Sequence, residues 1–203
     1  MTISYPLAMP TQPGFVDIRI SKDTAVGISE SPWTLTSQVQ TYPGQRWRAE
    51  FSLPPMSRAD SETWQCFLLQ LDGQRGTFLM GDPFGATPRG TWRGSPKVNG
   101  AGQFGLSLNI KSLDVGATIE PGDYIQIGQR LYKNISSSTV TADGSGLATI
   151  DIWPRLRESY GDGDSIITES AKGLFRLADS SHELYNSTAM EYYSITLSAV
   201  EAI

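Results

Sequence analysis

The chain has 203 residues, 16 of them basic and 21 acidic, for a formal net charge of -5. The basic residues are scattered singly, which argues against a protein that binds a nucleic-acid backbone stably. With 20 glycines, 12 prolines and 39% hydrophobic residues, the composition indicates a turn-rich, folded β protein. No apolar run reaches 18 residues and Met1–Pro13 does not resemble a signal peptide, so we expect a soluble protein that folds in a cytoplasm, without membrane insertion.

Four strands are predicted in the N-terminal quarter of the chain. Alternation of apolar and polar residues favours strands at Phe15–Ile20, Lys22–Ile28 and Trp33–Thr41. Tyr42–Gly44 contains proline and glycine and is predicted to turn the chain. The fourth strand, Trp47–Leu53, alternates strictly, so a hairpin is expected around Tyr42–Gly44.

A helix is predicted after the two prolines that end this strand. Ser57 and Asp60 have the spacing of an acidic capping box, and Gly73 suits the left-handed residue that follows a helix. Between them, apolar side chains recur at i, i+3, i+4 and i+7 and form one stripe. We predict that this stripe packs the helix against a sheet, and its members are Trp64, Phe67, Leu68 and Leu71.

The rest of the chain predicts a small barrel and a return to the first sheet. Thr77–Met80 is extended, and Phe84–Gly102 is rich in glycine and proline, which fits a domain boundary. Short alternating runs then follow as far as Ile167 and predict an oligonucleotide/oligosaccharide-binding (OB) type of barrel, although alternation also fits a sandwich. The strand around Tyr193–Ala199 is expected to rejoin the first sheet, because two strands alone are barely stable.

The predicted fold is therefore mainly β, with two domains. Residues 1–88 and 173–203 form a parent domain, a β-sandwich or split barrel with one packing helix. Residues 89–172 form an inserted OB-like barrel.

Single reactive residues give little support for catalysis or cofactor binding. Cys66 is the one cysteine and is predicted to be a small buried side chain. His182 is the one histidine, which excludes a catalytic triad or a two-histidine metal site, and we expect a solvated loop residue. We expect no catalytic residue, cofactor or metal.

One acidic cluster contains residue types that could bind calcium. Its spacing does not match an EF-hand loop, and Asp-Gly pairs are common in hairpin turns, so turns are the favoured interpretation. The cluster consists of Glu158, Asp162, Asp164 and Glu169.

The order of these pieces resembles the distal tail protein (Dit) family of phages with long non-contractile tails, the siphoviruses. The resemblance covers most of the chain from about Arg46, and is weaker before it. It rests on the strand-helix-strand unit Trp47–Pro83 with its GDP turn, on Leu106–Ile110, Pro121–Ile125 and Leu131–Lys133, and on the closing strand Tyr193–Leu197. In the short form of that family, a β-rich parent domain carries an OB-fold insertion.

The resemblance implies a structural protein of the virion and not an enzyme. Six copies would form a ring at the distal end of the tail tube, assembled in the host cytoplasm. The ring would join the tube protein to the tail tip or baseplate hub protein, and tail-fibre or collar proteins are possible further partners. DNA would pass through the channel without specific binding, and we expect acidic residues to line that channel. Edge strands at Phe15–Ile20 and at the C-terminus are expected to pair between subunits.

Two other functions compete with the ring protein. A carbohydrate-binding, host-recognition module would stack sugars on Trp92, Tyr132 or Trp153. A wall-degrading hydrolase has less support, because no set of nucleophile, base and orienting residue is evident.

Overall fold

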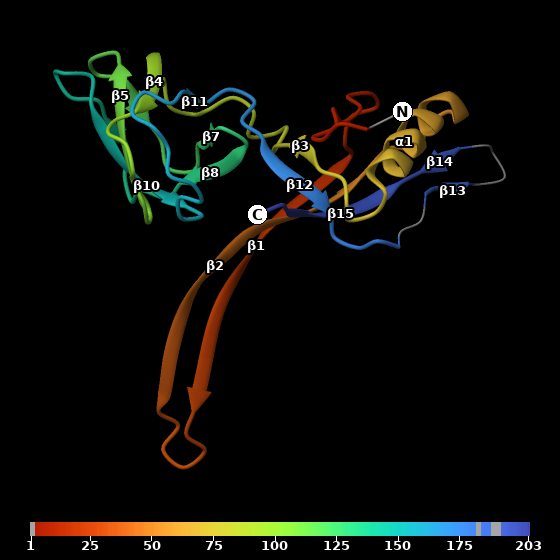
Figure 1. Ribbon diagram of the computed structural model, residues 1–203, viewed down its shortest axis with the longest axis horizontal. Helices are drawn as coiled ribbons and strands as arrows, with labels where there is room; N and C mark the ends of the chain where they lie inside the picture. The colour runs from red at the N-terminus through yellow and green to blue at the C-terminus, as the bar shows by residue number, and fades with distance from the viewer. Residues whose placement is uncertain (1–2, 182–183, 188–191) are drawn as a thin grey trace.

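The computed structural model describes residues 3–181, 184–187 and 192–203. The protein is mainly β, as predicted. It has a five-stranded sheet with a helix, a barrel-like sheet beside it, and a long two-stranded hairpin that projects from the two (Figure 1).

The five-stranded sheet joins the two ends of the chain. Its strands are β1 (Asp17–Glu30), β2 (Ser37–Ser52), β15 (Thr196–Glu201), β12 (Gly173–Leu177) and β3 (Phe78–Met80), in that spatial order. In β15, Ala199 pairs with Ala49 on one side and with Leu177 on the other. The closing strand therefore returns to the first sheet, as predicted. The expectation that it is a free edge is wrong, because both of its sides are hydrogen-bonded within the chain.

The helix α1 (Arg58–Leu71) has the predicted cap and the predicted buried stripe. The Asp60 amide donates to Ser57 Oγ at 3.4 Å, and Ser57 Oγ donates to the Asp60 carboxylate at 2.8 Å. Asp72 and Gly73 both have positive φ, 52° and 64°, so the left-handed end begins one residue before the predicted glycine. The stripe side chains Trp64, Phe67, Leu68 and Leu71 are all buried.

The barrel-like sheet contains every strand between Gly94 and Ile167 except one short pair. In spatial order its strands are β11 (Ile166–Ile167), β7 (Tyr124–Ile127), β8 (Arg130–Asn134), β10 (Ala148–Trp153), β5 (Ser107–Leu113) and β4 (Gly94–Val98). Its two edge strands approach one another, since a bridge joins Lys97 to Ser165 and the Val98 amide donates to Asp164 O at 2.9 Å. Two further two-stranded pairs are β6 (Thr118–Ile119) with β9 (Val140–Thr141), and β13 (Asn186–Ser187) with β14 (Tyr193–Ser194).

Two details of this barrel differ from the sequence prediction. β4 lies in the glycine-rich stretch that was predicted as a boundary, and alternation does not reveal it because its sequence is GSPKV. Pro96 is tolerated there because β4 is an edge strand. Phe104 alternates with Leu106, Leu108 and Ile110 in the sequence, a pattern that predicts one strand, but Phe104 lies before β5 and its side chain is 88% exposed.

The barrel and the five-stranded sheet are joined by packing and by a buried ion pair. Tyr124 and Leu131 come from the barrel but belong to the core beneath the helix. Arg157 Nη2 lies 3.0 Å from Glu201 Oε2, and the two side chains are only 8% and 1% exposed. This pair ties the segment after β10 to the C-terminal strand.

The hairpin differs most from the prediction. β1 runs without interruption through Lys22–Ile28, and β2 continues through Tyr42–Gly44, where a turn was predicted. The chain turns at Ser31–Thr36 instead, which the Ser31 amide closes by donating to Thr36 O at 3.0 Å. Tyr42–Gly44 forms a bulge, because the register passes from Thr24↔Gln45 to Val26↔Thr41. A bulge accommodates proline, which cannot donate to the ladder.

Candidate functional site: a projecting arm

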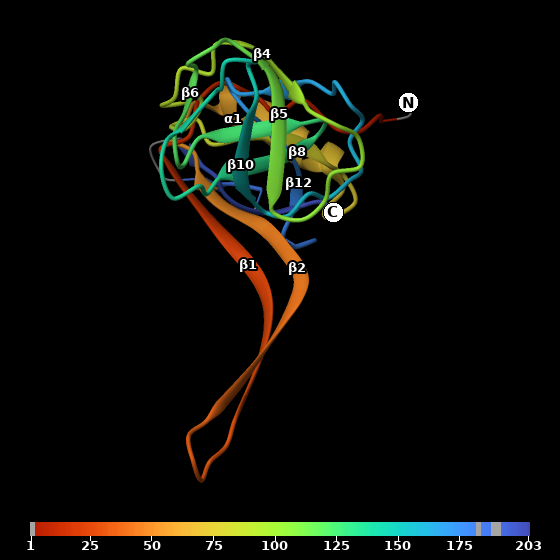
Figure 2. The same ribbon diagram turned by 90° about the vertical axis from the view of Figure 1, so that its left-hand side faces the viewer.

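Residues 24–45 form an arm, defined here as the outer part of β1 and β2 with the loop between them. Figures 1 and 2 show it leaving the body of the protein as a twisted ribbon. Its apolar side chains have no core to enter, and Trp33 in the end loop is 92% exposed. Large exposed apolar side chains gathered on one element indicate a binding surface. Those of the arm are Val26, Ile28, Trp33, Leu35, Val39 and Tyr42.

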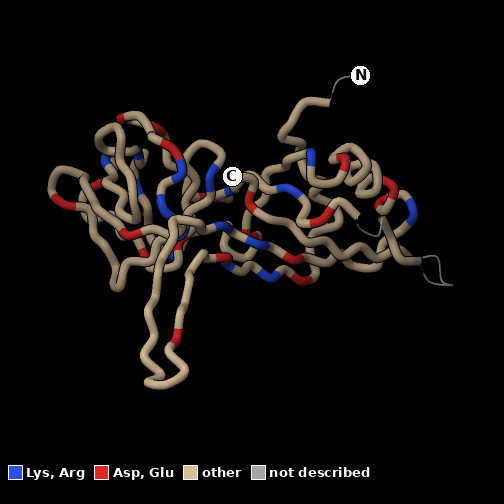
Figure 3. The backbone as a smooth tube through the Cα atoms, turned by 60° about the horizontal axis from the view of Figure 1, so that its bottom comes forward, with Lys and Arg blue, Asp and Glu red and all other residues tan. Residues whose placement is uncertain are grey.

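The arm carries almost no charge. Glu30 is its one charged residue in the sequence, and Figure 3 shows the rest of the projecting tube in tan, the colour of residues other than Lys, Arg, Asp and Glu. Exposed edge strands are usually protected from association by charged side chains, lysine above all. The arm lacks this protection, so its edges and side chains are suited to contact with another protein.

The base of the arm is held by an ion-pair triad. Asp23 Oδ2 accepts from Arg46 Nε at 2.8 Å and from Arg48 Nη2 at 3.3 Å. The hydrogen bond from Arg46, with Arg48 beside it, holds the pKa of the Asp23 carboxyl below its usual value, against a smaller desolvation effect. Because these residues face one another across β1 and β2, the triad pins the two strands together where they leave the sheet.

The barrel also holds the base of the arm. Gln45 Oε1 accepts from the Arg155 amide at 2.9 Å, and Gln45 O accepts from the Arg157 guanidinium. Two residues further along β2, the rings of Trp47 and Trp153 meet edge to face with centroids 4.3 Å apart. The barrel therefore contributes to the direction in which the arm projects.

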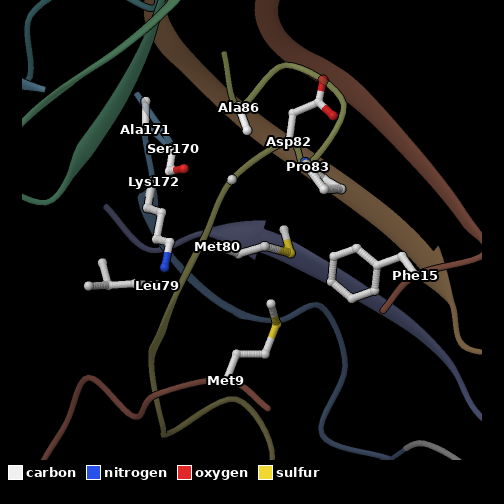
Figure 4. A pocket seen from close by; sticks show the side chains of 11 residues that line it. Met9, Phe15, Leu79, Met80, Asp82, Pro83, Ala86, Ser170, Ala171 and Lys172 are labelled. Carbon is white, nitrogen blue, oxygen red and sulfur yellow. The ribbon is translucent and has the colours of Figure 1, made fainter. Parts of the chain in front are cut away.

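A cavity of about 270 Å³ lies at the opposite end of the sheet, beside β3. We call it the methionine cavity, because the side chains of Met9 and Met80 approach one another across it (Figure 4). Phe15 closes one side, and Leu79 and Lys172 lie on another. Its lining is mainly apolar, so it suits an apolar side chain better than a sugar or an ion.

The predicted sugar-stacking platform is not formed. Trp92 is buried in the barrel, where its Nε1 donates to Asp123 at 2.8 Å. Tyr132 is also buried, with its hydroxyl 2.8 Å from that of Tyr160. Only Trp153 keeps partial exposure, beside a shallow cavity of about 380 Å³ that Lys22 and Lys133 also line.

The buried carboxylate of Asp123 explains why Trp92 is buried in the barrel. Its carboxylate is buried and accepts from the backbone amides of Arg89, Gly90 and Glu120 as well as from Trp92. A tryptophan can be buried when its indole N–H finds such a partner. In the sequence, Asp123 follows a Pro-Gly pair, which is typical of a turn and does not reveal the buried role of the carboxylate.

Cys66 is exposed, so the prediction of a buried thiol is wrong. The reason is helical geometry: two residues after Trp64, the side chain points away from the buried stripe. The predicted solvated role of His182 lies outside the described residues.

The acidic cluster is not brought together as a metal site. Asp162 pairs with Lys111 Nζ at 2.6 Å, Glu158 pairs with Arg130 at 2.8 Å, and Asp164 accepts from the Gly161 amide at 2.7 Å. Across residues 3–181, 184–187 and 192–203, no three side chains of the metal-binding types are grouped as a metal site would require.

In the same ranges, no helix is both long enough and apolar enough to cross a membrane.

Sequence reasoning missed the arm itself, although the sequence contains a signal for it. From Thr24 to Gln45 the chain carries one charge while apolar residues continue to alternate. Alternation without charge is typical of ordinary strands in a packed sheet, so it did not predict an arm.

Compared with known proteins, the chain matches no protein-family model and no curated protein sequence.

Proposed function

We propose that the protein is a structural ring component of a phage tail, without chemistry of its own. Copies of the chain would form a ring at the distal end of the tail tube, join the tube to the tail-tip hub, and let DNA pass. The proposal is based on the sequence resemblance, and the structural observation that supports it best is the arm.

The arm favours assembly for energetic reasons. Each large apolar side chain that a neighbouring subunit covers contributes roughly 1.5 to 3 kcal/mol. The arm extends from one side of the body. A contact in which the arm of each subunit meets a different surface on the next subunit is head-to-tail. Head-to-tail contacts close into a ring when the rotation between subunits divides a circle.

In the proposed ring, the outer edge of β1 is the edge that pairs with another subunit. β1 is the first strand of the five-stranded sheet, so one of its sides has no neighbour in that sheet. Backbone groups along that edge can pair with a strand of another subunit. The acidic net charge of -5 is compatible with a lumen that does not retain DNA.

Negative-stain images of the purified protein test this proposal. A population of rings with a central hole is the expected result. Separate particles of single-subunit size at every concentration, also after mixing with tail tube protein, would refute the ring.

The carbohydrate-binding alternative now depends on Trp153. This side chain is partly exposed beside Lys22 and Lys133, an arrangement that fits an acidic sugar. A glycan array tests it, because a carbohydrate-binding module gives signals that disappear in Trp153→Ala. A blank array at high protein concentration would exclude this function.

A further inference from the structure

We propose that the arm of one copy docks its end loop in the methionine cavity of a second copy, with Trp33 as the inserted side chain. This inference rests on the proposed function, because both require the arm to contact another copy. It adds the two surfaces that meet and the residue that dominates the contact.

Trp33 is the natural anchor of the arm. Its side chain is 92% exposed and lies in the loop that ends the hairpin. Tryptophan is over-represented among the residues that carry most of the binding energy of protein interfaces, where it fills a pocket on the partner. Burial of such an aromatic side chain removes on the order of 150 to 250 Å² from water.

The methionine cavity fits one aromatic side chain. Its volume of about 270 Å³ lies just below the range of roughly 300 to 1,000 Å³ typical of small-molecule sites. Met9 and Met80 place their thioethers at the cavity (Figure 4). Methionine packs favourably at aromatic rings and adapts to their shape.

The occupant must come from another copy. At about 3.3 Å per residue, β1 carries the chain about 23 Å from Asp23 to Glu30. The arm points away from the part of the body that holds β3, as Figure 1 shows. To reach its own cavity, the loop would have to break the hydrogen bonds between β1 and β2.

Charge complementarity supports the same pairing. Glu30 precedes Trp33 by three residues, and Lys172 lines the cavity. Neither side chain forms an ion pair with a residue that the structure describes. Asp82, the acidic residue of the cavity lining, already accepts from the Phe84 amide at 2.9 Å. Docking would therefore give Glu30 and Lys172 an oppositely charged partner.

The decisive experiment compares two exposed aromatic side chains. Trp33→Ala removes the anchor, and Phe104→Ala removes a side chain that is 88% exposed on a loop of the barrel. Sedimentation velocity over a concentration series measures the self-association constant of each variant. We expect Trp33→Ala to weaken self-association by about 30-fold or more, the value for a hot-spot residue, and Phe104→Ala to leave it unchanged.

Two further variants test the receiving surface. In a Cys66→Ser background that keeps Trp33, Thr34→Cys with Met9→Cys should form a disulfide between subunits, whereas Phe104→Cys with Met9→Cys should not. Glu30→Lys and Lys172→Glu should each weaken self-association, and the double exchange should restore it.

The outcomes separate this inference from the ring proposal. Rings that are equally stable in Trp33→Ala, or that fail to cross-link, would overturn the docking inference and leave the ring proposal standing. A wild-type protein that stays at 22.2 kDa at every concentration, also after mixing with tail tube protein, would overturn both.

Discussion

Replacing Arg157 by methionine is predicted to destabilise the whole protein, not only the barrel. The guanidinium donates to Glu201 Oε2 at 3.0 Å and to Gln45 O, so it joins the barrel segment to both the C-terminal strand and the base of the arm. The Glu201 side chain is 1% exposed, and water cannot replace the lost partner easily.

The size of the predicted loss of stability follows from the buried Glu201 charge, which the substitution leaves without its partner. Removing one partner of a buried ion pair costs roughly 3 to 5 kcal/mol, because the other charge stays buried and uncompensated. In Arg157→Met, Glu201 Oε2 would keep only the hydrogen bond from the Trp47 amide, at 3.1 Å. Replacing both partners removes that penalty, so Arg157→Met with Glu201→Gln should recover part of the loss.

Urea unfolding followed by tryptophan fluorescence measures these free energies. The single variant should lose about 3 to 5 kcal/mol in one transition, and the double variant should lose less. A loss below about 1 kcal/mol for Arg157→Met would refute the reasoning, since that is the value of an exposed pair. Two separate transitions in the wild-type protein would refute the coupling of barrel and sheet.

Three other perturbations test the packing and the charges. Phe67→Ala should cost about 3 to 5 kcal/mol in urea unfolding, because the ring packs on both the helix and β3, whereas Leu69→Ala on the exposed helix face should change little. Burial, with Asp82 nearby, raises the pKa of Tyr124 from 10.0 to about 12. The free energy of unfolding should therefore fall as the pH rises from 10 to 12, because the unfolded state loses the phenolic proton first. If the dependence of this free energy on pH is the same in Tyr124→Phe, the prediction is wrong. The pKa of Asp23 is lowered from 3.8, so its contribution at the arm base should persist above pH 3.8 and be lost as the pH falls below it; carboxyl titration by NMR would disprove this if the midpoint lies at or above 3.8.

The sequence predicts local features of the fold well, because they depend on near neighbours. The Ser57 cap and the stripe from Trp64 to Leu71 each depend on spacings of three or four residues. Alternation also predicts strands of the barrel such as β5 and β10, although it does not reveal β4. The return of β15 to the first sheet was predictable because the strands that follow the barrel are too few to form a core of their own.

Features that depend on distant partners were not predictable from sequence. Trp92 is buried because of Asp123, 31 positions away, and Tyr132 because of Tyr160, 28 positions away. From sequence, both residues are therefore candidates for the sugar-stacking platform that the carbohydrate-binding alternative requires. The arm escaped prediction for a related reason, since alternation shows that a strand has two faces but not whether the same chain covers either.

Native mass measurement of the full-length chain and of an arm-shortened variant tests the account most directly. The variant lacks residues 27–40 and joins Val26 to Thr41, which are paired in the hairpin, through an Asn-Gly turn. We expect the full-length protein to assemble at about six times 22.2 kDa and the variant to remain a folded monomer. Equal masses for the two proteins would contradict the claim that the arm builds the ring.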